Sequence, residues 1–237
     1  LAALTGAALS VAGAILQSLL RNDLAAPFTL GVSSGAALGA VIAISLGLPY
    51  SIADIPTVPI AAFLGSLGAI SLVFSLARTR TGEFPTPILL LAGVTANFFF
   101  ASLVMLIHYL SDFTQSFRIV RWLMGGLDIT SYKTLLSISP MIFIGFAVLI
   151  FYGRDFNVMS TGIQSAMSRG VEVIKVQKIG FIMASLLTGT VVSLSGPIGF
   201  VGLIVPHIVR LIVGPDSRIL FPASIFFGAS FLIICDT

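Results

Sequence analysis

The sequence has few charged residues and a single cysteine, and both shortages exclude whole classes of protein. Only 9% of its 237 residues are charged, whereas 57% are hydrophobic and the mean hydropathy is +1.11. A soluble domain carries about 25% charged residues, so a chain of this composition could not cover its surface with polar groups. Cys235 has no second cysteine in the sequence, which excludes an internal disulfide framework and a thiolate metal cluster. The composition predicts a polytopic membrane protein.

Several motifs of catalysis are also missing. No stretch matches the phosphate-binding pattern GxxxxGK[ST], so we do not expect this chain to hydrolyse ATP. His108 and His207 lie on different segments and neither has a second histidine at ligand spacing, which argues against a metal site. We interpret His207, next to Pro206, as a hydrogen-bonding residue at a helix end. No serine lies in a nucleophile elbow, so we predict neither an enzyme nor a cofactor.

The apolar runs that are present favour helices. They are long, continuous and rich in Leu, Ile, Ala and Gly, whereas the strands of a membrane barrel would alternate in polarity over short segments. We therefore predict an all-α transmembrane bundle, a single domain over 1–237, with eight spans at residues 1–20, 30–48, 60–77, 86–110, 135–151, 179–194, 199–213 and 219–235. The seventh has only 15 residues, below the ~20 that a full span needs, so we expect a short or partly sunken helix after a break at residues 195–197.

Two patterns inside the spans concern packing. Gly31, Gly35 and Gly39 recur at four-residue spacing, which predicts a flat stripe that another backbone can approach. Asn97 lies in the middle of its span, where an unpaired amide is costly, so we expect it to bond a neighbouring helix, with a water-filled pathway as the alternative. A short surface helix is expected within 111–133, because Trp122 is typical of the membrane interface.

The basic residues predict an orientation. If the spans alternate, nine of the twelve Lys and Arg residues fall on one side, and Arg118, Arg121 and Lys133 fall on the other. The positive-inside rule places the group of nine in the cytoplasm. The segment 154–178, the longest polar interruption of the chain, is then a cytoplasmic loop.

We expect one short helix in this loop, over residues 160–169. Ile163 and Met167 would lie on the same side of it, and Gly170 would end it in a left-handed cap. A helix with a small apolar face suits a groove in a cytoplasmic protein; an ordinary solvated loop is the alternative.

An internal repeat is also visible. Residues 5–15 align without a gap on residues 188–198, with five of eleven positions identical. In an alternating topology the two copies run in opposite directions, as in transporters built from inverted repeats. Chance similarity between two helices rich in small residues is the alternative. The sequence also starts and stops at apolar runs and does not begin with methionine, so we expect an internal piece of a longer protein.

Four stretches together resemble the FecCD-like permease subunits of ABC-type importers for iron-siderophores, haem and cobalamin. They are residues 13–25 (GAILQ through RNDLA), 90–93 (LLAG), 122–127 (WLMGGL) and 196–211 (GPIGFVGLIVPHIVRL). The last stretch is the most specific, and the resemblance marks as its motif residues Gly196, Pro197, Gly199, Pro206, His207 and Arg210.

The resemblance implies the following assembly. The subunit has ten helices, of which the eight spans here are the second to the ninth, and it pairs with a copy of itself or a close paralogue in the cell (inner) membrane of a bacterium or archaeon. Cytoplasmic ATPase subunits, an extracytoplasmic substrate-binding protein and membrane lipid are the expected partners; nucleic acid is not. An iron-siderophore is the preferred cargo, with haem or cobalamin as alternatives, and an ion-coupled carrier without an ATPase as a further one.

The resemblance also implies site residues. The coupling helices that sit on the ATPase would include Ser160, Thr161, Gly162, Ile163, Ala166, Met167, Arg169, Gly170 and Val171. Arg169 stands near the place of the family's usual leucine, so the resemblance does not define which face of this helix contacts the ATPase.

An inner gate is implied at two places. Its candidates are Asn22 and Leu24 after the first span, Thr86 and Pro87 at the start of the fourth, and Asn97 as a pathway residue. Asp23 replaces the family's usual proline, which predicts a less rigid turn. On the other side, Arg118 and Arg121 do not match the family's docking arginines for a binding protein.

Overall fold

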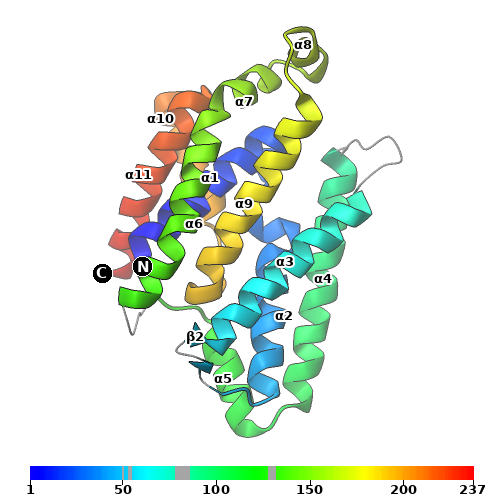
Figure 1. The fold of residues 1–237 in the computed structure, drawn as a ribbon, viewed down its shortest axis with the longest axis vertical. Coiled ribbons are helices and arrows are strands. Elements are labelled where there is room, and N and C mark those ends of the chain that lie inside the picture. The colour runs from blue at the N-terminus through cyan, green and yellow to red at the C-terminus, as the bar shows by residue number, and fades with distance from the viewer. Residues whose placement is uncertain (50, 53–54, 78–85, 128–131) are drawn as a thin grey trace.

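A computed structural model of the chain shows an elongated bundle of α-helices (Figure 1) and describes all residues except 50, 53–54, 78–85 and 128–131. The helices are α1 (Ala2–Leu20), the 3-10 helix η1 (Pro27–Leu30), α2 (Val32–Ser45), α3 (Thr57–Ala77), α4 (Thr86–Leu110), α5 (Phe113–Leu123), α6 (Tyr132–Phe151), α7 (Gly153–Ser160), α8 (Ile163–Ser168), α9 (Val173–Ser195), α10 (Val201–Val213) and α11 (Ser217–Asp236). Between α2 and α3, the two-residue strands β1 (Ser51–Ile52) and β2 (Ile55–Pro56) pair antiparallel.

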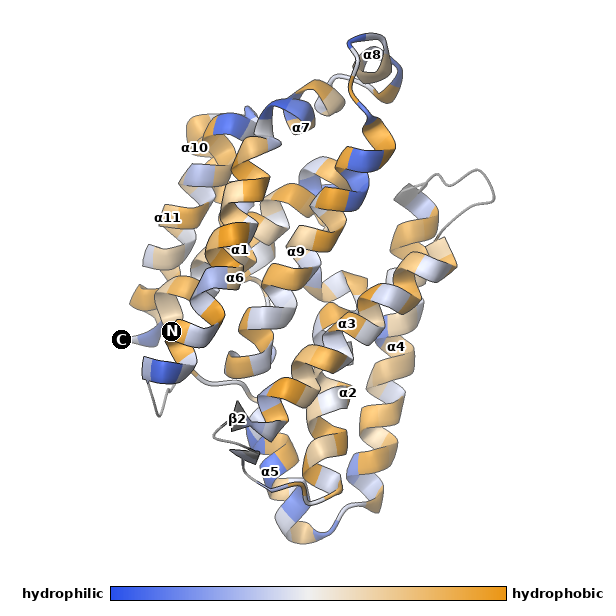
Figure 2. Cartoon of the chain, viewed as in Figure 1, coloured by the Kyte–Doolittle hydropathy of each residue, from blue (hydrophilic) through white to orange (hydrophobic). Residues whose placement is uncertain are grey.

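Eight of these helices are apolar and correspond one to one with the expected spans. Among the described residues, α1, α3, α4, α6, α9 and α11 are long and apolar enough to cross a membrane, and α2 and α10 are apolar but shorter. In Figure 2, hydrophobic residues dominate these helices, while hydrophilic ones gather around α7 and α8 at one end and α5 at the other. The predicted helical membrane bundle is confirmed.

Several expected boundaries need correction. α3 begins at Thr57 rather than at residue 60, because the hairpin occupies only a few residues before it. α9 begins at Val173 rather than at residue 179, so its first turns take up the end of the expected loop 154–178. The break after α9 is where the sequence predicted it, since that helix ends at Ser195 and Gly196 has a φ of 69°.

The expected surface helix is present as α5, and its start follows from a local motif. The Asp112 side chain accepts a hydrogen bond from the Gln115 backbone N–H at 2.8 Å, and the Gln115 side-chain oxygen accepts one from the Asp112 N–H at 3.3 Å. These reciprocal bonds form a capping box, which satisfies backbone donors that a helix start leaves free. The Gln115 amide also donates to the Ser45 carbonyl at 2.9 Å, which fastens α5 to the end of α2.

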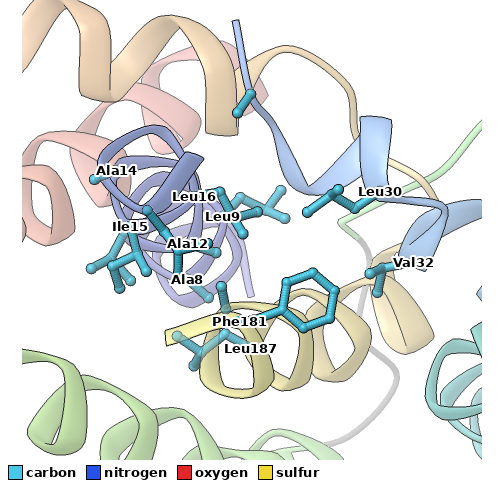
Figure 3. Close-up of a cluster of buried hydrophobic side chains, with 14 of the residues drawn as sticks. Ala8, Leu9, Ala12, Ala14, Ile15, Leu16, Leu30, Val32, Phe181 and Leu187 are labelled. Carbon is cyan, nitrogen blue, oxygen red and sulfur yellow. The ribbon is translucent and has the colours of Figure 1, made fainter. Parts of the chain in front are cut away.

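The core is organised around α1. In the 18-residue apolar stretch of α1, 83% of the residues are buried, against 33% or less in the corresponding stretches of α3, α4, α6 and α11. α1 therefore lies inside the bundle, while those four helices leave one side exposed to lipid. Figure 3 shows Phe181 and Leu187 of α9, and Leu30 of η1, beside the α1 side chains. All three of these neighbours are at most 2% exposed.

Glycines allow the helices around α1 to approach closely. A Cβ on Gly13 would lie 1.7 Å from the Gly202 carbonyl oxygen of α10, and one on Gly6 would lie 2.1 Å from the Gly228 oxygen of α11. Such distances leave no room for any side chain, so the backbones themselves are in contact.

The predicted glycine stripe of the second span is confirmed at two of its three positions. Gly35 and Gly39 face α3, where a Cβ on Gly39 would lie 2.1 Å from the Ala61 oxygen. Gly31 instead caps α2 with a φ of 77°, a conformation that glycine adopts at little cost.

The two copies of the repeat differ in local structure. α1 and α9 pack together and run in opposite directions (Figure 1). Residues 5–12 and 188–195 are all helical, but residues 196–198 leave the helix whereas residues 13–15 stay in it. The inverted-repeat relationship stays a prediction.

Candidate functional site: the polar end of the bundle

The segment between α6 and α9 forms two short helices rather than the single helix expected over 160–169. α7 ends at Ser160, and α8 begins only at Ile163. Between them Gly162 has a φ of 136°, a backbone conformation that other residues rarely adopt. The hydroxyls of Ser160 and Thr161 donate to α7 carbonyl oxygens at 2.7 and 2.9 Å, so both side chains close the end of α7.

The end of α8 confirms the predicted left-handed cap at Gly170. Its φ is 81°, its N–H donates to the Met167 carbonyl at 3.0 Å, and the Val171 N–H donates to the Ala166 carbonyl at 3.0 Å. This pair of bonds is a Schellman motif, which satisfies the carbonyls that a helix end leaves free. A Cβ on Gly170 would have no neighbour within 4 Å, so the backbone conformation alone favours glycine here.

α8 presents an apolar pair to the outside. Ile163 and Met167 are 42% and 52% exposed, whereas Ala166 is fully buried and holds the helix against the chain. Arg169 is exposed beside them, and Val171 is half-buried. The unit of α7 and α8 projects beyond the membrane helices at one end of the bundle (Figure 1). A cavity of about 620 Å³ adjoins it, lined by Met167, Val171 and the first turns of α9.

The turn after α1 lies against this unit. Arg21 ends α1 in a left-handed conformation, with a φ of 49°, and its guanidinium donates to the Met159 carbonyl at the end of α7 at 2.5 Å. Asn22 accepts a hydrogen bond from the Leu24 N–H at 2.9 Å, and the Leu24 side chain is 72% exposed. Two of the gate candidates therefore belong to one tight turn.

Asp23 does not leave this turn loose, contrary to the expectation from its replacement of proline. Its carboxylate forms an ion pair with Arg210 of α10. Arg210 also donates to the Gln17 side-chain oxygen at 3.1 Å, and the Gln17 amide donates to the Leu203 carbonyl at 3.1 Å. Sequence reasoning missed Gln17 and Arg21; a lone amide in the apolar run of α1 was the available signal for the former.

The remaining gate candidates lie on α4. This helix begins at Thr86, whose side chain is outside the described residues, and Pro87 is exposed in its first turn. Asn97 is half-buried beside the start of α2, since a Cβ on Gly31 would lie 3.4 Å from its backbone nitrogen. Within the described residues its side chain makes no hydrogen bond, so the expected bond to a neighbouring helix is not formed.

The motif over residues 196–211 divides between a turn and a helix. Pro197 is half-buried and Gly199 is exposed. Phe200, the residue before α10, has a φ of 65° and is 75% exposed. Pro206 and His207 both lie inside α10, where the exposed imidazole makes no hydrogen bond to the described chain. Our interpretation of His207 as a helix-end hydrogen-bonding residue is therefore wrong.

At the opposite end of the bundle, the turn after α5 packs against the break between α9 and α10. The Gly126 N–H donates to the Ser195 carbonyl at 2.8 Å, and a Cβ on Gly196 would lie 2.6 Å from the Trp122 carbonyl oxygen. A cavity of about 450 Å³ there is lined by residues that include Arg118 and Arg121. Neither arginine forms an ion pair with an acidic residue in the part of the chain that the structure describes.

Among the described residues, eight apolar helices, of which α1 lies buried inside the bundle, and a helical unit that projects at one polar end define a polytopic helical membrane protein. Residues 1–237 match the FecCD transport family. The chain belongs to this family, and the resemblance stated from its motifs is confirmed.

Named relatives agree with this assignment. The chain is 41% identical to the ABC transporter permease protein YvrB of Bacillus subtilis, 42% to the cobalamin import system permease protein BtuC of Halobacterium salinarum and 37% to the hemin transport system permease protein HmuU of Yersinia pestis. All of the chain is matched in each case, but it spans only 67%, 63% and 71% of their respective lengths.

A solved structure shares the fold. It is described as an inward-facing conformation of a metal-chelate type ABC transporter, with a TM-score of 0.89 and 30% identity, over 99% of this chain and 74% of that one.

Proposed function

We propose that this chain forms most of the membrane permease subunit of an ATP-driven importer for a bulky iron chelate. The observation that carries the proposal is the α7–α8 unit. Its exposed Ile163 and Met167 form a small apolar surface on a capped helix outside the membrane helices, which suits docking into a groove of another protein. Because the sequence has no phosphate-binding loop, the energy for transport would come from that docked protein.

The proposed assembly follows from the two polar ends. The α7–α8 unit, with the exposed Ile163 and Met167 as its main contacts, faces the cytoplasm and sits on an ATPase subunit. A second permease subunit completes the pathway, and an extracytoplasmic binding protein delivers cargo at the end that carries α5. The turn at Asn22 and Leu24 and the start of α4 would form the inner gate.

The choice of an iron chelate rests on the relatives. Their names include a probable iron chelatin permease of Helicobacter pylori at 33% identity and an Fe(3+)-citrate permease of Bacillus subtilis at 31%, beside those for hemin and cobalamin. Iron-siderophore is the first candidate among these cargoes, with haem and cobalamin as the alternatives.

Two measurements test the proposal. The full-length protein should co-purify with an ATPase and, in vesicles with its binding protein, should import labelled ferric siderophore only when ATP is supplied. Competition with haem and cobalamin would then identify the cargo. Full uptake by the permease without an ATPase would contradict the proposal and favour an ion-coupled carrier.

A further inference from the structure

We infer that the turn of residues 21–24 transmits movement of the α7–α8 unit to α1 and α10. The positioning residues for this are Arg21, Asp23, Arg210 and Gln17, and we call this set of four residues the junction. The inference rests on the proposed function, because it names how the docked ATPase would act on the inner gate.

The first link joins the coupling unit to the turn. The Arg21 guanidinium donates to the carbonyl oxygen of Met159 in the last turn of α7, at 2.5 Å. The same carbonyl accepts the Gly162 N–H at 3.2 Å, so Arg21 is bonded to the turn that closes α7. Met159 itself is buried, so α7 cannot shift at this end without moving the Arg21 side chain or breaking this bond.

The second link joins the turn to α10. Asp23, two residues after Arg21, forms the ion pair with Arg210, and Arg210 also donates to Gln17. The Arg210 side chain is only 20% exposed. A partly buried guanidinium with two acceptors is held in a defined position, and a charge-assisted bond is stronger than a neutral one.

The third link returns to the core. Gln17 is 1% exposed and donates to the Leu203 carbonyl of α10. Next to it, the backbones of α1 and α10 touch at Gly13 and Gly202. Since packed helices of this kind move as units rather than deforming, a pull on Arg21 displaces the turn together with the ends of α1 and α10.

The turn itself is suited to transmit such a pull. Arg21 is held with a φ of 49°, which a non-glycine residue adopts only at a cost in free energy. The Leu24 N–H is fixed to the Asn22 side chain. The anchored residues are Arg21 and Asp23. Of the gate candidates, Asn22 lies between them and Leu24 follows Asp23, so the positions of both candidates depend on both anchors.

Replacement of Arg21 by Asn tests the first link, because asparagine tolerates the left-handed conformation but cannot reach Met159 in place of the guanidinium. Asp23→Asn tests the second link, since it removes the charge at nearly equal volume. In vesicles with the ATPase and binding protein, we expect cargo imported per ATP hydrolysed to fall by about tenfold, as the loss of one charge-assisted hydrogen bond would give. ATP hydrolysis itself should continue.

Two further variants separate coupling from folding. Arg154→Asn removes an exposed arginine of α7 that makes no hydrogen bond or ion pair with the described chain, so its ratio of cargo to ATP should equal that of the wild type. Arg21→Lys keeps a donor and should recover part of the loss. Amide hydrogen exchange should be faster over residues 153–160 in Arg21→Asn and unchanged there in Asp23→Asn.

The outcomes are distinct. Import by Arg21→Asn and Asp23→Asn with the wild-type ratio would overturn the junction while leaving the proposed function intact. Failure of the wild-type assembly to import any chelate would overturn the proposed function instead. If Arg21→Asn does not accumulate in membranes, Asp23→Asn decides, because its side chain is 62% exposed and its replacement leaves the core untouched.

Discussion

α1 and α8 are opposites in how they are held. α1 is enclosed by α9, α10 and α11 and touches two of them through bare backbone at Gly13 and Gly6. α8 has its main contacts with α7 and α9, its neighbours in sequence, and Ala166 is its one buried residue in the described chain. Its C-terminal end is stabilised by the hydrogen bonds of its own glycine cap. A helix held by close packing tolerates no added volume, whereas a helix held by local hydrogen bonds leaves its outer face free for a partner.

The largest effect is expected from Gly13→Ala. The new Cβ would lie 1.7 Å from the Gly202 oxygen, and neither backbone can yield without moving a buried helix, so destabilisation should exceed about 3 kcal/mol. Thermal unfolding in detergent, or loss of folded protein from membranes, measures it. Gly68→Ala on α3 is the matched control, since a Cβ there meets nothing within 4 Å; equal stability of the two variants would contradict this account of α1.

The next effect concerns the cap of α8. A β-branched residue at Gly170 would have space but the wrong backbone preference, which costs about 1–2 kcal/mol at a φ of 81°. Gly170→Val should therefore uncouple ATP hydrolysis from uptake while the protein stays in the membrane. Gly170→Asn, which tolerates this conformation better, should retain more uptake. Unchanged transport by Gly170→Val in vesicles would rule out this role for α8.

A third change tests the outer face of α8 directly. Replacement of both Ile163 and Met167 by Ser should weaken ATPase binding by about tenfold or more, because two apolar contacts at an interface would be lost. Binding of the purified ATPase to the reconstituted permease measures it. The exposed neighbour Gln164→Ser is the control, and equal affinity of all variants would place the docking surface elsewhere.

The smallest effect is expected at the exposed start of α11. Arg218 holds the pKa of the Asp216 carboxyl below its ordinary value of 3.8, chiefly by side-chain hydrogen bonding and then through its backbone N–H. A lowered folded-state pKa means that this contribution is present above pH 3.8 and is lost as the pH falls through the lowered value. The melting temperature of Asp216→Asn should therefore be slightly lower than that of the wild type at neutral pH, and the difference should be smaller at pH 2–3. A difference that grows on acidification would contradict the assigned sign.

The sequence by itself determined the fold class, the eight apolar helices and the glycine cap of α8. These depend on composition, on the length of apolar runs and on the backbone freedom of residues such as Gly170 and Gly196. All of these are local properties that lipid and helix geometry convert directly into structure. The family motif over residues 196–211 added the resemblance that the comparisons confirm.

Only the tertiary structure decided which side chains meet across the chain. Asp23 looked like the loss of a rigid proline, but it pairs with Arg210, 187 residues further along. The positions of Gln17 in an apolar run and of Arg21 at the end of α1 do not identify their partners. Their partners depend on how α1, α7 and α10 converge, and sequence spacing carries no information on contacts over such distances. The polar loop between α6 and α9 was visible from charge alone, but its connection to the gate turn depends on where the folded helices place Arg21.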